Sequence, residues 1–306
     1  MELPSKHHHT SYPEDPEKIL QKFAGYLRRF PASSKLKTYE QADFLIVPHI
    51  DFRVNLSIYA QIYNLLIGRS RFPSTFVILG VGHRCPAEYS CCPFTFSTPL
   101  GEVSTHMGLW KELEESSAEP IAFYPETFEG EHSLEYVIVW LQVIRELFYP
   151  EQTFQVLPIL MGGLHQHIHY GIIPSSKDPF TEFGTNLKEA VTRHINSPDE
   201  VCWIASIDGC HVGPRFQHSF SGNRVTQQAV KTWESHLWQV CESNLLSTFF
   251  SHLSSIDNMF YFDGVGVLTL LLQHFNLRAI TDSYELWYQD YDQSFVSFTG
   301  GIMTRA

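Results

Sequence analysis

Residues 74–83 read Ser-Thr-Phe-Val-Ile-Leu-Gly-Val-Gly-His, a short apolar run that stops at glycines and a histidine. β-Branched and aromatic residues bounded by turn residues are typical of a buried strand. Three further runs of this kind occur at residues 43–49, 154–160 and 201–207. Because strands of a parallel sheet are covered on both faces, they are apolar throughout rather than alternating, and these four runs have that character.

Segments with helical spacing of apolar residues separate the four runs. They lie at residues 55–66, 132–148 and 181–195, and are followed by expected helices at 225–250 and 265–275 and closing strands at 277–286 and 295–303. This alternation of strand and helix predicts an α/β fold, a single three-layer α/β/α domain with a mainly parallel central sheet. We place this domain at residues 36–306 and assign residues 1–35 to an N-terminal extension with a first helix.

Composition limits the partners of the chain. It has 306 residues with 21 Lys and Arg against 33 Asp and Glu, a net charge of −12, and 43% of its residues are hydrophobic. Such a chain can bury a large core, and its charge argues against a nucleic-acid partner, which requires a basic surface. No apolar stretch reaches the roughly 20 residues of a membrane span, and the first twelve residues lack the apolar core of a secretory leader. We expect a cytoplasmic protein without a membrane partner.

The cysteines are expected to be reduced thiols. There are six in the whole chain and no C-x-x-C pair, which is sparse for a disulfide-stabilised fold. Cys210 stands beside His211, but neighbours on a turn usually point apart, so we interpret it as a packed thiol rather than a nucleophile. The glycine pairs at Gly80 and Gly264 lack the third glycine of a dinucleotide loop, and there is no Walker lysine or G-x-S-x-G elbow.

Polar residues stand where predicted strands stop or a helix starts. These residues are His49, His83, Asp208, His211 and Asp263. Functional groups of parallel sheets gather beyond the carboxyl ends of the strands, so these side chains are expected to share one edge. Two imidazoles and one carboxylate with open positions form the facial triad that suits non-haem Fe(II). Any one of these groups alone could equally cap a helix or satisfy a turn, and spacing does not identify the ligands.

Other histidines have simpler interpretations. His132 lies at a helix start beside Glu131 and Glu135, where acidic residues complement the helix dipole, although it could also belong to the pocket. The alternating histidines at 165, 167 and 169 are interpreted as part of a solvated loop over residues 162–175. The run at residues 7–9 is interpreted as a disordered terminal stretch outside the site.

The order of five short motifs resembles the Memo-like family, also called AmmeMemoRadiSam system protein B. The motifs are Val47-Pro-His-Ile-Asp-Phe52, Ile78-Leu-Gly-Val-Gly-His83, Glu131-His-Ser-Leu-Glu135, Ile207-Asp-Gly-Cys-His-Val-Gly213 and Asp263-Gly-Val-Gly266. The resemblance extends to Ser297-Phe-Thr-Gly-Gly301 and so covers nearly the whole chain. It implies a fold like that of class III extradiol dioxygenases, with a metal pocket at one edge of the sheet.

The resemblance also implies roles for particular residues. His49 and His83 match the family's metal-binding histidines, and Asp263 stands where many members have a cysteine ligand. A carboxylate favours harder metals than a thiolate does, so we expect a divalent metal, Fe(II) in the first place, with copper or zinc as alternatives. Where the family has Pro-His-Ala-Gly-Tyr, this chain has Pro-His-Ile-Asp-Phe. Ile50 and Asp51 therefore place a larger side chain and a negative charge beside the first ligand.

The remaining matches concern catalysis. Asp208 and His211 match an Asp-x-x-His pair, and His132 matches the histidine of a Glu-His-Ser motif. We expect His211, oriented by Asp208, to act as acid or base on a small substrate such as a dihydroxylated aromatic. Two other hypotheses stay open: a non-catalytic module that binds a protein or peptide in the same cleft, and a zinc site that activates water.

Overall fold

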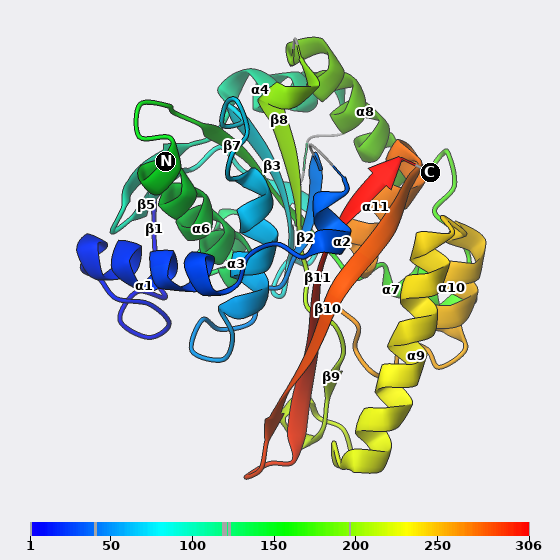
Figure 1. The fold of residues 1–306 in the computed structure, drawn as a ribbon. Helices are drawn as coiled ribbons and strands as arrows, with labels where there is room; N and C mark the ends of the chain where they lie inside the picture. The colour runs from blue at the N-terminus through cyan, green and yellow to red at the C-terminus, as the bar shows by residue number, and fades with distance from the viewer. Residues whose placement is uncertain (1, 40–41, 118–120, 122–123, 196, 306) are drawn as a thin grey trace.

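A mixed β-sheet with a parallel centre runs through the middle of the fold (Figure 1). The computed structural model describes residues 2–39, 42–117, 121, 124–195 and 197–305. In these residues the strand order is β10-β11-β2-β8-β3-β7-β4, and β9 pairs with β11. The bounds are β2 Phe44–Val47, β3 Thr75–Val81, β4 Tyr89–Cys91, β7 Gln155–Met161, β8 Val201–Ser206, β9 His211–Val212, β10 Leu277–Gln289 and β11 Ser294–Arg305.

The four predicted buried strands form the parallel centre. β2, β8, β3 and β7 are neighbours and all run in the same direction. Every residue of β3 and β8 is buried, which explains their continuous apolar sequence. The parallel part is confined to this centre, because β4, β10 and β11 join it in antiparallel fashion. β10 and β11 are joined by a turn at residues 290–293, and a connection this short permits only antiparallel pairing.

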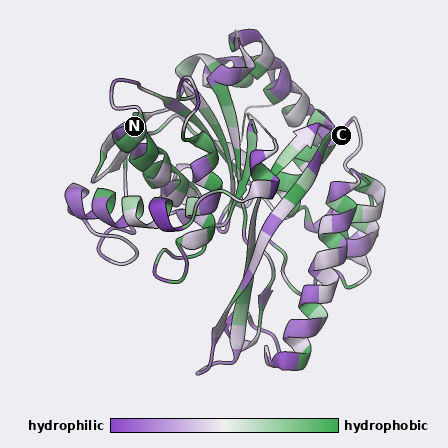
Figure 2. Ribbon diagram, in the orientation of Figure 1, coloured by the Kyte–Doolittle hydropathy of each residue, from purple (hydrophilic) through white to green (hydrophobic). Residues whose placement is uncertain are grey.

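Helices cover both faces of the sheet, so the expected three-layer α/β/α arrangement is confirmed. One face packs against α1 Pro16–Arg29, α3 Ser57–Tyr63 and α6 His132–Phe148. The other packs against α4 Met107–Ser116, α8 Pro179–His194, α9 Arg224–Glu242, α10 Leu246–Ser254 and α11 Val265–Phe275. Successive strand residues alternate between the two cores: Phe76 and Ile78 belong to one, Val77 and Leu79 to the other. Figure 2 shows hydrophobic residues along the central strands and on the helix surfaces that face them.

A smaller sheet and several short helices complete the chain. β1 Glu2–Pro4 pairs with β5 Thr95–Thr98, which pairs with β6 Gly101–Ser104. The short helices are α2 Ser34–Lys37, α5 Pro125–Phe128 and α7 His165–Tyr170, with 3-10 turns at Asn64–Leu66, Pro198–Glu200 and Pro214–Phe216. Within the described residues, every helix is too short or too polar to span a bilayer.

Two expectations about local structure are wrong. The segment around His167 contains the helix α7 rather than only a loop, because Ile168 packs into the core between the histidines. The expected single helix over residues 225–250 is two helices, α9 and α10, which are separated at residue Asn244. Asn244 has a left-handed backbone, φ 51°, which ends the first helix.

All six cysteines are free thiols, as predicted, and Cys85 alone among them is not fully buried.

Candidate metal centre

The carboxyl ends of three adjacent parallel strands bring the predicted residues together. His49 follows β2, Asp208 follows β8 and His83 follows β3, each at the second position after its strand ends. A cleft of about 950 Å³ opens at this edge. The cleft is lined by His49, Asp208, His83, His132 and His211, together with Ile50, Asp51, Arg53, Tyr136, Arg215, Phe216 and Trp287. The order of the strands therefore places residues that are distant in the sequence side by side in one wall of the cleft.

Three histidines form the centre of this cleft. One ring nitrogen from each of His49, His83 and His132 lies within 4.8 Å of the others. The rings of His83 and His132 stack at 4.7 Å, and the ring of His49 stands nearly perpendicular to both at 5.1 Å. His49 is 1% exposed, whereas the other two are partly open to the cleft. His132 therefore belongs to the cleft, which was one of the two interpretations that its place at a helix start left open.

The carboxylate of Glu131 orients two of these rings. Its Oε1 lies 3.0 Å from Nδ1 of His83 and 3.3 Å from Nδ1 of His132, and it also caps α6 by accepting the backbone N–H of Ser133. Burial opposes its charge, but the hydrogen bonds from His132 and His83 hold the pKa of Glu131 well below the ordinary range. An ionised acceptor on Nδ1 fixes the tautomer and leaves Nε2 of each ring free to bind a metal.

His49 is held by different partners. Its Nδ1 lies 3.2 Å from the backbone oxygen of Ser206, so Nδ1 carries the hydrogen and Nε2 is free. Its backbone N–H, like that of Ile50, donates to Oδ1 of Asp208, at 2.9 and 3.1 Å. Nε2 of His49 is buried and has no hydrogen-bond partner among the described residues. A buried ring nitrogen that meets no backbone or hydroxyl partner and faces only carboxylates fits a metal ligand once it has lost its proton.

Asp263 supplies a carboxylate at the same point. It precedes α11, and its Oδ2 lies 3.2 Å from Nε2 of His49. Both carboxylate oxygens are buried and make no hydrogen bond to any described residue. The short aspartate side chain thus reaches Nε2 of His49. The ligand atoms that lie within 4.8 Å of one another are those of the three histidines, and Asp263 is not among them.

The pKa values of the groups at the centre depend on their burial and on the charged groups close to them. Burial acts to lower the pKa of His49, but the carboxylates of Asp208 and Asp263 outweigh it and raise this pKa to about 9. The pKa of His132 falls to about 4, because burial and the nearby His49 and His83 outweigh the attraction of Glu131. Burial acts to raise the pKa of Asp263, but His49 lowers it on balance. The pocket therefore stabilises positive charge beside Asp263, which is the environment that a cation needs.

His211 is placed on the cleft wall by β9. Its Nδ1 lies 3.3 Å from the backbone oxygen of Tyr261, so Nε2 is the free nitrogen. The hydrogen bonds of the described residues do not include one between Asp208 and this ring, and Oδ1 of Asp208 accepts the backbone N–H groups of His49 and Ile50. Asp208 instead fixes the turn that carries the first histidine. Burial raises the pKa of Asp208.

The interpretation of the N-terminal histidine run as a disordered stretch outside the site is wrong, because residues 7–9 are ordered and His7 lies in the cleft. The backbone N–H groups of Lys6 and His7 donate to the carboxylate of Glu135 at 2.8 and 2.9 Å, and the hydroxyl of Tyr12 donates to it at 2.6 Å. His7 lines the cleft with its ring 5.8 Å from that of His132. The sequence feature that could have predicted this contact is Glu135. It is a carboxylate on an otherwise apolar, buried helix, and a buried carboxylate needs hydrogen-bond donors.

Comparisons with known proteins agree with the motifs. The family model described as Memo-like protein matches residues 4–296. A protein of Aquifex aeolicus (strain VF5) described as "MEMO1 family protein" is 25% identical over 219 residues, which are 70% of this chain and 50% of that protein. The chain thus spans about half the length of this relative.

Proposed function

Because the chain belongs to the Memo-like protein family, we propose that its cleft binds one divalent metal ion and acts as an oxidoreductase on a small substrate. The observation that carries the proposal is the free Nε2 of His49, which is buried 3.2 Å from a carboxylate that also lacks hydrogen bonds. Without a metal the two groups face each other as an ion pair, because the carboxylates of Asp208 and Asp263 raise the pKa of His49 to about 9. A bound cation would replace the proton between them and satisfy both buried groups. His49, His83 and Asp263 are the proposed ligands, with Fe(II) as the preferred metal.

The carboxylate ligand supports iron over softer metals. Asp263 offers oxygen beside His49, and the described cluster consists of three imidazoles, without a cysteine. When bound, Fe(II) would supply Lewis-acid and one-electron redox chemistry. Glu131 would hold His83 in its ligating orientation.

Proton transfer is assigned to His211. The carbonyl of Tyr261 keeps the hydrogen on Nδ1, so Nε2 can take a proton from a substrate hydroxyl in the cleft. Asp208 acts through the backbone of His49 and is a positioning residue. His132 faces the same space with a low pKa, about 4, and is therefore a neutral hydrogen-bonding group near pH 7. Aromatic residues Tyr136, Phe216 and Trp287 in the wall suit a dihydroxylated aromatic substrate.

A second candidate function follows from the size of the cleft. At about 950 Å³ it is far larger than one aromatic ring, and Arg53 and Arg215 line it. A peptide or protein segment could occupy this space without any reaction. A zinc centre that activates water is the third alternative and is distinguished by the identity of the bound metal.

The test is oxygen consumption by the chain reconstituted anaerobically with Fe(II), on a panel of substituted catechols. The proposal expects oxygen uptake with at least one catechol, and a loss of about 100-fold in His211→Ala at unchanged iron content. Arg84→Ala, on the surface near Glu129, is the matched control and keeps the activity. No uptake across the panel by fully iron-loaded protein would contradict the oxidoreductase and favour the binding module.

A further inference from the structure

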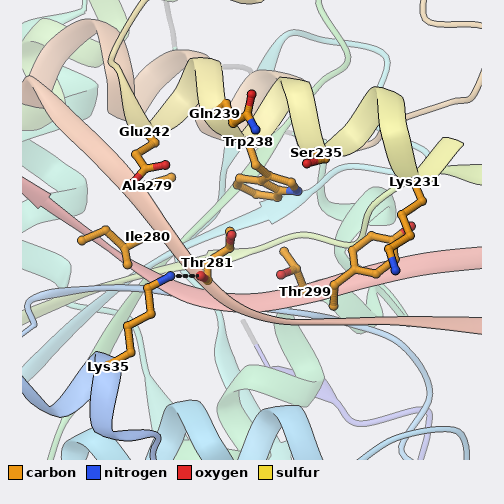
Figure 3. Close-up of a pocket in the computed structure, with 11 residues that line it drawn as sticks. Lys35, Lys231, Ser235, Trp238, Gln239, Glu242, Ala279, Ile280, Thr281 and Thr299 are labelled. Atoms are coloured by element: carbon orange, nitrogen blue, oxygen red, sulfur yellow. Dashed lines mark hydrogen bonds between the residues drawn. The ribbon is translucent and has the colours of Figure 1, made fainter.

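A second cavity lies between α9, the β10–β11 hairpin and α2 (Figure 3). Its volume is about 240 Å³, and none of its lining residues borders the metal cleft. The residues that give it chemical character are Lys35, Lys231, Trp238, Glu242, Tyr284 and Thr299. Figure 3 shows the indole of Trp238 projecting from α9 toward the strands of the hairpin.

The charges around the cavity favour an anion. Nζ of Lys35 donates to the backbone oxygen of Thr281 at 2.8 Å, and Nζ of Lys231 lies 5.8 Å from the ring centre of Tyr284. Neither lysine is in an ion pair with a described carboxylate, although the whole chain carries a net charge of −12. Glu242 lines the same space, so the lining has two positive groups and one negative group. A surplus of one positive charge suits a monoanion better than a multiply charged phosphate.

The size and walls of the cavity favour a small flat ligand. A space of about 240 Å³ is below the range of drug-sized pockets, which begins at roughly 300 Å³. Trp238 and Tyr284 offer aromatic surface, and Thr299 adds a hydroxyl. We propose that this cavity is a second ligand site, which binds a small aromatic monocarboxylate of one ring.

The cavity is linked to the metal centre by a buried carboxyl group. The hydroxyl of Tyr284 donates to Oε2 of Glu234 at 2.8 Å, and Glu234 is 1% exposed. Glu234 packs so closely on the turn after β8 that a Cβ at Gly209 would lie 2.3 Å from its Oε1. Gly209 follows Asp208 directly and precedes the turn that carries His211. A ligand that displaces Tyr284 would therefore act on the turn that positions both residues.

Binding is tested with 4-fluorobenzoate, followed by ¹⁹F NMR titration of the full chain. We expect saturable binding that Lys231→Met weakens by about threefold or more and that a Lys35→Met, Lys231→Met double variant weakens further, since each removes one exposed charge contact. Lys111→Met, an exposed lysine on α4, is the matched control and leaves binding unchanged. Neutral 4-fluorobenzamide and inorganic phosphate are expected to bind more weakly.

Two results of the binding experiment would overturn the proposed second site. Absence of saturable 4-fluorobenzoate binding would overturn the proposal, as would binding that is equal in the Lys231→Met variant, because the probe would then sit elsewhere. Hydrogen exchange gives an independent readout of the link: the probe should slow exchange of the amides at residues 207–211 in wild type and not in Tyr284→Phe. None of these measurements depends on metal or activity, so their failure is separate from failure of the proposed oxidoreductase.

Discussion

Nε2 of His49 and Oδ2 of Asp263 lie 3.2 Å apart, although the two residues are more than 200 positions apart in the chain. His49 follows the strand β2, and Asp263 precedes the helix α11. Both atoms are buried, and no described residue gives a hydrogen bond to either of them. The pair offers one nitrogen and one oxygen donor side by side, and in the proposed site the oxygen donor would favour a harder metal.

Changing the carboxylate should change that preference. Asp263→Cys replaces an oxygen donor by a thiolate, so we expect weaker retention of Fe(II) and stronger retention of Zn(II) or Cu(I). Competitive dialysis against equal concentrations of these metals, followed by elemental analysis, measures the shift. Asp257→Cys, an exposed position on a nearby loop, serves as the thiol control. Equal metal selectivity in Asp263→Cys and wild type would mean that residue 263 is not a ligand.

Glu131 is expected to act on the metal without touching it. Glu131→Gln replaces the ionised acceptor of His83 and His132, and loss of such an outer carboxylate typically costs about 10- to 100-fold in metal affinity. The measurement is the metal dissociation constant, determined by titration with a chelator. Glu129→Gln, two residues away on the surface, should keep the wild-type constant. If Glu131→Gln binds metal as tightly as wild type, the histidines are not oriented in the way described here.

Glu234 should make stability fall as pH rises. Burial raises its pKa to about 7, above the ordinary value near 4.3, because hydrogen bonds from Ser297 and Tyr284 only partly offset the loss of water. Between about pH 4.5 and 7 the folded state therefore holds a proton that the unfolded state has released, and the free energy of unfolding declines. The full effect is on the order of 3 kcal/mol.

The comparison that isolates this group is Glu234→Gln against wild type. Urea unfolding at a series of pH values from 5 to 8 should show the difference in stability moving in favour of the glutamine variant as pH rises. Glu102→Gln, an exposed residue on β6, controls for the general loss of one charge. A constant difference across this pH range would show that Glu234 is ionised throughout.

The N-terminal segment should depend on Glu135. Glu135→Ala removes the acceptor of the Lys6 and His7 amides and of the Tyr12 hydroxyl, so residues 6–12 should be cut by protease much faster than in wild type. Tyr12→Phe removes one of these three hydrogen bonds and should cost about 1 kcal/mol of stability. His7→Ala should alter the Michaelis constant of any cleft substrate while metal content stays the same. Cleavage rates of residues 6–12 that are identical in Glu135→Ala and wild type would contradict this role.

Much of the fold could be predicted because burial left a clear pattern in the sequence. The strand at residues 75–81 is buried throughout and almost entirely apolar since helices cover both of its faces, and it ends just before Gly82 and His83. The positions of His49, His83 and Asp208 after strands were visible for the same reason. The family resemblance then added roles to these positions.

Other contacts could not be predicted because they depend on where side chains point. His7 meets Glu135 across 128 positions, and no periodicity links the two. The tautomer of His211 depends on the carbonyl of Tyr261, and the sequence order suggested Asp208 instead. The helix at His165–Tyr170 has one buried apolar residue, Ile168, which is too weak a pattern to distinguish a short helix from a loop.

In the proposed site, His49, His83 and Asp263 together hold one divalent metal, with iron preferred. This claim is tested most directly by elemental analysis after anaerobic reconstitution with Fe(II) and removal of excess metal. Wild type should retain about one iron per chain, while His49→Ala and Asp263→Ala retain almost none and still unfold cooperatively. Iron retention equal to wild type in both variants, or no iron in wild type, would contradict the account.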